Sequence, residues 1–333
     1  MVKYFIAGES AALTQVESFQ PLCWVDMVSP TDGEVEKVSR ETKIPEDMIK
    51  AALDEEEMAR TEFDEGCSMF VVDCPVIEES DAGDAYSTLP LAVIYNKNCI
   101  MTVCLKGNPV LKDFITGRTK VRCDSPVQFI LNFMLGNSKR FLYCLKQIDR
   151  RSQRVQAELG SKLKNDDILQ LLELENSLVY FSTSLNANAK VHEKLAKAEA
   201  VTGREDYRDV YDDLLIECNQ AIEMCKIYKD TLSVSMDAYG SVISNNANDS
   251  MKKLTVITIL LAIPTMIAGF WGMNMPVPFQ AFNGETSTIW FWVVIGCTFI
   301  VTAAVAVLML KTNILSRPKQ PKAKRQRKNR KKK

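Results

Sequence analysis

The stretch SNNANDSMKKLTVITILLAIPTMIAGFWGMN, residues 244–274, decides the fold. After two lysines it contains 17 consecutive uncharged residues, 254–270, and a second uncharged run of 22 residues follows at 289–310. Both runs are long enough to cross about 30 Å of hydrocarbon as helices. Lysines bracket the pair and Trp290 and Trp292 mark one edge, which argues against a buried hairpin of core helices. The sequence therefore predicts an α+β membrane protein with two spanning helices.

The distribution of charge predicts how the chain is oriented. The loop between the spans contains one acidic residue, Glu285, and no lysine or arginine, whereas the tail 311–333 has 12 basic residues and no acidic one. The positive-inside rule then places both termini in the cytoplasm and the loop outside, in a cell (plasma) membrane. We expect the proline-interrupted tail to stay unfolded and to bind anionic lipid heads, each basic residue near the surface contributing about 1 kcal/mol. Binding of nucleic acid by this tail is the less favoured alternative, and no nucleic acid partner is expected.

The first 124 residues have the pattern of an α/β domain. Thr31, with Glu34 three residues later, predicts a capped helix start. Residues 54–65 are expected to form a solvated acidic face, with a divalent-cation contact as the alternative. Five short apolar runs are typical of strands: 2–7, 22–28, 68–77, 86–95 and 99–105.

The cysteines and the histidine of the whole chain are expected to have structural roles only. Ten cysteines without a CxxC pair favour reduced core residues. The single histidine, His192, is expected at the surface.

A long helix is predicted to join this domain to the first span. From Ser125 onward the pattern is helical, and it breaks only near Thr202. The segment 205–270 has 66 residues with two glycines and a single proline, Pro264. As one continuous helix it would be about 100 Å long. The sequence thus predicts a stalk helix that continues directly into the membrane.

One face of this helix carries small and polar residues. A packing seam between lipid-bathed helices is one interpretation of such a face. Because the pattern continues through Asn248 to Asp237, outside the span, a water-filled axis is favoured. Two spans cannot enclose a pore alone, so this axis requires several chains. The positions, connected by steps of three or four residues, are Asp237, Ser241, Ser244, Asn248, Met251, Thr255, Thr258, Ala262, Thr265, Gly269 and Gly272.

The tripeptide Gly272-Met273-Asn274 ends this stripe on the outer side. Glycine lets neighbouring chains approach one another, and the carboxamide oxygen of Asn274 carries no charge. A ring of such oxygens can accept hydrogen bonds from the water shell of a cation without removing that shell. This suits Mg²⁺, which loses its waters reluctantly.

At these residues the sequence resembles the CorA family of magnesium transporters. The resemblance covers nearly the whole chain, including the stretch 244–274, YRDVYDD at 207–213 and WVDMVSP at 24–30. It implies a funnel-shaped homopentamer with one axial pore and a selectivity filter of Gly272, Met273 and Asn274. The pore-lining positions that it implies are Asp237, at the inner mouth, Asn248, Met251, Leu254, Thr255, Thr258, Ala262 and Thr265.

The resulting organisation has six parts. They are a cytoplasmic α/β domain at 1–124, a cytoplasmic helical and stalk region at 125–250, a first transmembrane helix at 251–271, an external loop at 272–288, a second transmembrane helix at 289–310 and the basic tail at 311–333.

The resemblance implies channel-like Mg²⁺ influx driven by the membrane potential, with Co²⁺ and Ni²⁺ as further ions. Trp271 stands where the family usually has tyrosine, and the loop reads MPVP at 275–278 where many members are acidic. A zinc transporter of the same superfamily and a non-conducting membrane-tethered sensor are the alternatives. An enzyme is not expected, because no catalytic constellation or P-loop occurs in the sequence.

Three carboxylates suggest how such a pore could be regulated. Asp206, Asp209 and Asp213 follow one another at i, i+3 and i+7, so they share a face of the stalk helix. A solvated acidic surface is one interpretation. The hypothesis is a regulatory Mg²⁺ site between subunits that holds the pore shut, formed by Asp209 and Asp213, since family members have intersubunit metal sites on the stalk.

Overall fold

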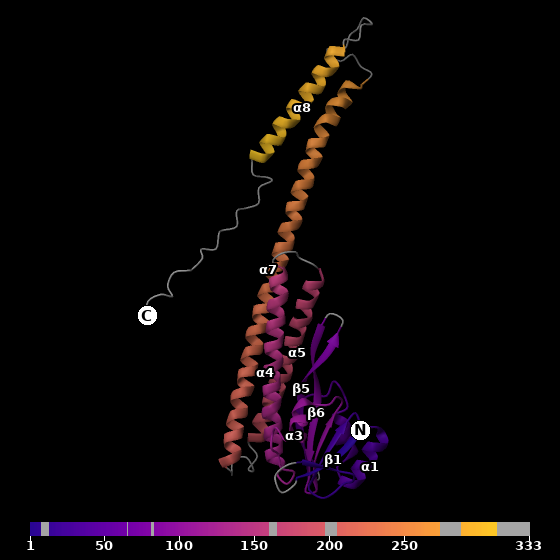
Figure 1. Cartoon of the computed structure of the whole chain (residues 1–333), viewed down its shortest axis with the longest axis vertical. Helices are drawn as coiled ribbons and strands as arrows, with labels where there is room; N and C mark the ends of the chain where they lie inside the picture. Colours follow the sequence, from indigo (N-terminus) through magenta and orange to yellow (C-terminus); the bar gives the residue numbers. More distant parts are fainter. Residues whose placement is uncertain are drawn as a thin grey trace, which may run out of the picture. The chain divides into compact units, whose positions relative to one another are not determined.

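The computed structural model describes residues 1–7, 13–64, 66–80, 83–159, 165–196, 205–273 and 288–311 (Figure 1). These residues belong to two compact units, Met1–Met236 and Asp237–Lys333. Each unit is described by itself below. The predicted Asn274, most of the external loop and the tail from 312 lie outside the described residues.

The first unit is built on a mixed sheet whose described strands follow the order β2-β1-β3-β7-β6-β5-β4. Strands β3 and β7 are parallel, and the other neighbours are antiparallel. All five predicted strands are present, but β2 and β4 were not predicted. The strands are β1 (Val2–Ala7), β2 (Leu13–Val16), β3 (Cys23–Val28), β4 (Arg60–Asp64), β5 (Cys67–Ser80), β6 (Gly83–Tyr95) and β7 (Cys99–Cys104).

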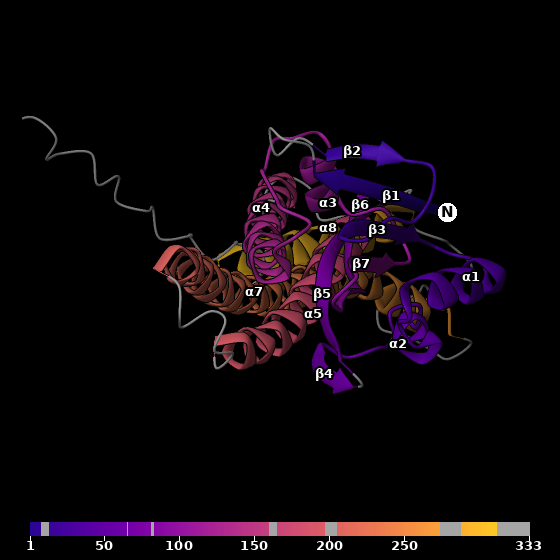
Figure 2. The same cartoon turned by 90° about the horizontal axis from the view of Figure 1, so that it is seen from below.

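Helices cover both faces of the sheet (Figure 2). On one face, α1 (Asp32–Thr42) and α2 (Glu46–Ala51) bury side chains such as Val35 against the sheet. The predicted capping box at Thr31 and Glu34 is confirmed at the start of α1. On the other face lie α3 (Pro109–Ile115), α4 (Pro126–Leu159) and α5 (Asn165–Ala196), with Leu214 of α7 (Glu205–Trp271) in the same apolar cluster.

Asparagine side chains fasten the two long helices to strand β5. Asn188 of α5 accepts a hydrogen bond from the backbone N–H of Asp73 (2.9 Å) and donates one to its carbonyl (2.9 Å). Asn137 of α4 donates to the same carbonyl at 2.8 Å. Asn188 thus satisfies the strand's backbone as a neighbouring strand would, and it fixes the helix against the sheet.

Two features of this unit differ from expectation. His192 is buried, not at the surface, with 2% of its area exposed, because its face of α5 packs toward α7, where the Tyr211 hydroxyl donates to the His192 carbonyl. This burial lowers the pKa of His192 to about 4. The acidic segment is exposed at residues 54–56, but from Arg60 it forms the edge strand β4, in which Arg60 pairs with Glu57 and Glu62.

The cysteines fit the predicted reduced core. Those described are free thiols, and all are buried except Cys297 in the second apolar helix. Burial raises the pKa of several thiols, for example to about 12 at Cys99. They therefore stay protonated at neutral pH and act as small apolar residues.

Helix α7 runs without interruption for 67 residues, which confirms the predicted continuous helix (Figure 1). Its first part packs on the first unit: Leu214, Cys218 and Cys225 are buried, and Cys225 Sγ donates to the Leu178 carbonyl. Helix α8 (Thr288–Lys311) follows. Parts of α7 and α8 are the two described segments long and apolar enough to cross a membrane. The interruption between α4 and α5 was not predicted.

Candidate ion-conduction pathway

The polar stripe of α7 lies on the surface of the chain in the second unit. The helix forms because 237–263 contains no proline and only one glycine, so its backbone ladder is unbroken up to Pro264. Every position of the stripe is exposed, from Asp237 to Gly272, and so is Leu254. A polar face that remains open along such a helix needs either water or other chains beside it.

The threonine hydroxyls of the stripe donate their hydrogens to backbone carbonyls of the same helix. Thr255 Oγ1 donates to the Met251 carbonyl and Thr258 Oγ1 to the Leu254 carbonyl, both at 2.9 Å. Thr265 Oγ1 lies within hydrogen-bonding distance of the Leu261 and Ala262 carbonyls, at 3.1 and 2.9 Å. A hydroxyl that donates backward in this way presents only lone pairs outward. The stripe therefore offers neutral acceptor oxygens, which suit the water shell of a cation.

The C-terminal end of the stripe is glycine-rich. Helix α7 ends at Trp271, and the Gly272 N–H still donates to the Ala268 carbonyl at 2.9 Å. A Cβ added at Gly269 would have no atom of the described chain within 4 Å. Packing inside the chain therefore does not require this glycine, whereas close approach of a second helix does favour a small residue there. Met273 is exposed.

The groove between the C-terminal part of α7 and the N-terminal part of α8 lacks the polar side chains that a cation path needs among its described lining residues. Its volume is about 500 Å³, and the described side chains of its wall are apolar apart from the indole of Trp271 and the hydroxyl of Thr298, whose Oγ1 donates to the Val294 carbonyl. No carboxylate occurs among the described residues that line it. Its lining includes Pro264, Trp271 and Phe291, a combination from two helices that the sequence pattern did not reveal. Of the stripe positions, only Gly272 lines the groove, so the polar side chains of the stripe lie outside it.

Asp209 and Asp213, proposed from the sequence for regulation, lie on α7 in the first unit. Both are exposed, as is Asp206, and none has an ion-pair partner among the residues that the structure describes. Within the described part of one chain, no group of three or more His, Cys, Asp or Glu side chains could hold a metal ion. A metal at these carboxylates would therefore need ligands from elsewhere.

Comparisons with known proteins show the family of this chain. The family described as CorA-like Mg²⁺ transporter protein matches residues 19–311. The cobalt/magnesium transport protein CorA of Methanocaldococcus jannaschii is 28% identical over 286 residues, which cover 84% of this chain and 87% of that protein. The protein of the same name from Thermotoga maritima is 23% identical over 232 residues, 66% of this chain and 63% of the relative.

The fold has a counterpart of known structure. The complete structure of the CorA magnesium transporter from Methanocaldococcus jannaschii superposes with a TM-score of 0.76 at 22% identity, covering 94% of this chain and 98% of that one. The chain therefore belongs to the family of CorA-like Mg²⁺ transporter proteins, and it is a membrane transporter of divalent cations rather than an enzyme.

Proposed function

We propose that this chain forms a homopentamer in which the α7 stripes face one another and line an axial pore for Mg²⁺. The observation that carries this proposal is the open stripe itself, whose threonine hydroxyls keep their lone pairs for an outside partner. One chain leaves the stripe uncovered, and five copies around an axis would enclose it. The self-assembly of family members supports the same arrangement.

Conduction in this pore follows from the residues along it. At the outer mouth, a ring of Asn274 carboxamides, with Gly272 and Met273, accepts hydrogen bonds from the waters of Mg²⁺. The ion then passes the acceptor oxygens of Thr265, Thr258 and Thr255. The remaining positions, Ala262, Leu254, Met251, Asn248 and Asp237, lead to the cytoplasmic mouth. Neutral oxygens hold the hydrated ion weakly, which lets it leave as readily as it enters.

The membrane potential supplies the driving force. A divalent cation that moves to the negative side gains about 4.6 kcal/mol per 100 mV. In the proposed topology both termini are cytoplasmic and the protein is in the plasma membrane, because the lysines and arginines flank the spans on one side. The basic tail would lie against anionic lipid heads on that side.

Regulation by cytoplasmic Mg²⁺ is proposed at Asp209 and Asp213. Their carboxylates, which have no ion-pair partner among the described residues, would repel those of neighbouring stalks when subunits assemble. Mg²⁺ that bridges them to a neighbouring subunit would remove this repulsion and stabilise a closed pore. Falling Mg²⁺ would release the subunits and open it, which gives negative feedback.

A bulky side chain on the stripe tests whether the stripe lines the pore. We expect Thr258→Phe to reduce Mg²⁺ flux into liposomes by at least about tenfold, because a ring of phenylalanines makes an apolar constriction that water leaves. The matched control is Ile257→Phe, which adds the same ring at a neighbouring exposed position off the stripe. Size-exclusion chromatography verifies that both variants assemble. Parent-like flux through the Thr258 variant, or an equal loss in both variants, would show that the stripe does not face the pore.

A further inference from the structure

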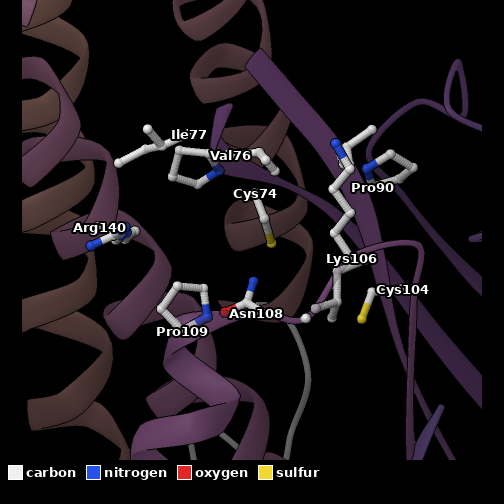
Figure 3. A pocket seen from close by; sticks show the side chains of 13 residues that line it. Cys74, Val76, Ile77, Pro90, Cys104, Lys106, Asn108, Pro109 and Arg140 are labelled. Atoms are coloured by element: carbon white, nitrogen blue, oxygen red, sulfur yellow. The ribbon is translucent and has the colours of Figure 1, made fainter. Parts of the chain in front are cut away.

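A small pocket in the first unit has the chemistry of a binding site and has no role in the transport described above. It lies between strands β5 and β6, the segment after β7 and helix α4 (Figure 3). Figure 3 shows Cys74 and Asn108 in the middle of the pocket, with Arg140 on the α4 side and Lys106 on the opposite side. Its lining is otherwise mostly apolar, including Pro75 and Pro90. We call it the Arg140 pocket.

Arg140 has an unused donor. Its Nε is fully buried and has no hydrogen-bond partner, and its guanidinium forms no ion pair within the described residues. The carbon Cζ lies 4.8 Å from the ring centre of Tyr143, one helical turn further along α4, so the aromatic ring supports the guanidinium on one face. Buried polar groups in proteins are almost always hydrogen-bonded, so the unpaired Nε indicates that no acceptor among the described residues holds this guanidinium. Its terminal Nη groups are left for a ligand.

The other polar groups of the pocket do not supply that acceptor. Asn108 Oδ1 already accepts from the Val110 N–H at 2.8 Å. The thiols of Cys74 and Cys104 donate to the carbonyls of Val72 and Met27. Burial raises the pKa of both thiols, to about 12 at Cys104, so neither places a negative charge in the pocket.

Charge favours an anion there. Lys106 pairs with Glu78, which is not part of the lining, so these two charges cancel each other. Arg140 then leaves the pocket with a net positive charge. The two terminal Nη groups of a guanidinium form an edge that binds carboxylate or phosphate oxygens in pairs, since guanidinium geometry matches both groups.

The volume of the cavity limits the size of the ligand. The cavity measures about 140 Å³, several times the space that a single water needs. It is smaller than the roughly 300–1,000 Å³ typical of drug-sized ligands. A group of a few heavy atoms fits these limits.

We propose that the Arg140 pocket binds a small oxyanion, a phosphate or carboxylate group, with the guanidinium of Arg140 as its main partner. The site is independent of the proposed pore, because its residues belong to the α/β domain and α4. Bridging waters and a carboxylate from a second copy of the chain are the competing occupants.

Chemical protection in the parent protein tests the proposal without a variant. Phenylglyoxal modifies accessible arginines, and peptide mass spectrometry reads each site separately. The full-length assembly in detergent is treated in phosphate, acetate or chloride at equal ionic strength. Inorganic phosphate is expected to slow the modification of Arg140 at least about threefold relative to chloride, which is the control. The rate in acetate tests whether a carboxylate binds instead. Arg150, exposed on the same helix, should react equally in all three salts.

Affinity measurements then identify the partner side chain. Thermal-shift titration with phosphate should give a dissociation constant that rises at least about tenfold in Arg140→Gln and stays unchanged in Arg150→Gln, because a charge-assisted hydrogen bond is lost only in the first. Arg140→Lys keeps the positive charge but loses the planar guanidinium edge. Its affinity for phosphate should therefore fall between those of the parent protein and of Arg140→Gln.

Several results would overturn the proposal. Equal reaction of Arg140 in phosphate, acetate and chloride would indicate an occupant that is only water. An Arg140 that never reacts in the assembly but reacts after dissociation into monomers would assign the pocket to a carboxylate of a second copy.

Discussion

Replacing Asn274 by alanine is expected to abolish Mg²⁺ uptake while leaving the oligomer intact. The methyl group cannot accept hydrogen bonds from the water shell of the ion, and a pentameric ring loses five acceptors at once. Because each hydrogen bond to a charged partner is worth about 1.5–3 kcal/mol, we expect uptake to fall at least about a hundredfold. Initial rates of Mg²⁺ uptake by reconstituted protein provide the measurement.

The control for this variant is Asn246→Ala, an exposed asparagine of α7 off the stripe. Its uptake should equal that of the parent. Asn274→Asp adds information, since a ring of carboxylates should hold the cation more tightly and release it more slowly. Undiminished uptake by Asn274→Ala would remove Asn274 from the selectivity filter.

The double substitution Asp209→Asn and Asp213→Asn is expected to leave conduction intact but make it insensitive to internal Mg²⁺. The amides keep nearly the same size and remove the negative charges, so subunits no longer need a bridging cation to lie together. Currents recorded while internal Mg²⁺ is raised through the millimolar range check this. The parent should close progressively, and the double variant should keep an almost constant open fraction.

Asp230→Asn is the matched control for this pair. Asp230 is also exposed on α7 but lies 17 residues beyond Asp213, about 25 Å further along the helix. It should close at the same Mg²⁺ concentration as the parent. If the double variant also closes at that concentration, the sensor lies elsewhere, and the exposed acidic residues 54–56 become the next candidates.

The elements with strong local signals could be predicted from the sequence. The start of α1 followed from Thr31 and Glu34, because a capping box is made by residues three positions apart. The length of α7 followed from the scarcity of proline and glycine over 66 residues. The stripe was proposed from helical periodicity, and its place along a pore stays a prediction.

The elements that escaped prediction depend on tertiary contacts. Strands β2 and β4 lie at the two edges of the sheet, where one side of the ladder is open and the apolar alternation is weak. His192 was wrongly expected at the surface, because the polar residues around it hide a face of α5 that packs toward α7. The Arg140 pocket combines residues from four separate parts of the chain, so no sequence spacing reveals it.

The measurement that tests the central proposal most directly is the initial rate of Mg²⁺ uptake into liposomes, taken at a series of imposed potentials and repeated with Zn²⁺. The proposed pore requires Mg²⁺ uptake that grows as the interior is made more negative, because a divalent cation gains about 4.6 kcal/mol per 100 mV. We expect this voltage dependence for Mg²⁺ and slower uptake of Zn²⁺. Uptake of Zn²⁺ without Mg²⁺, or no flux of either ion at any potential, would contradict a Mg²⁺ pore along α7.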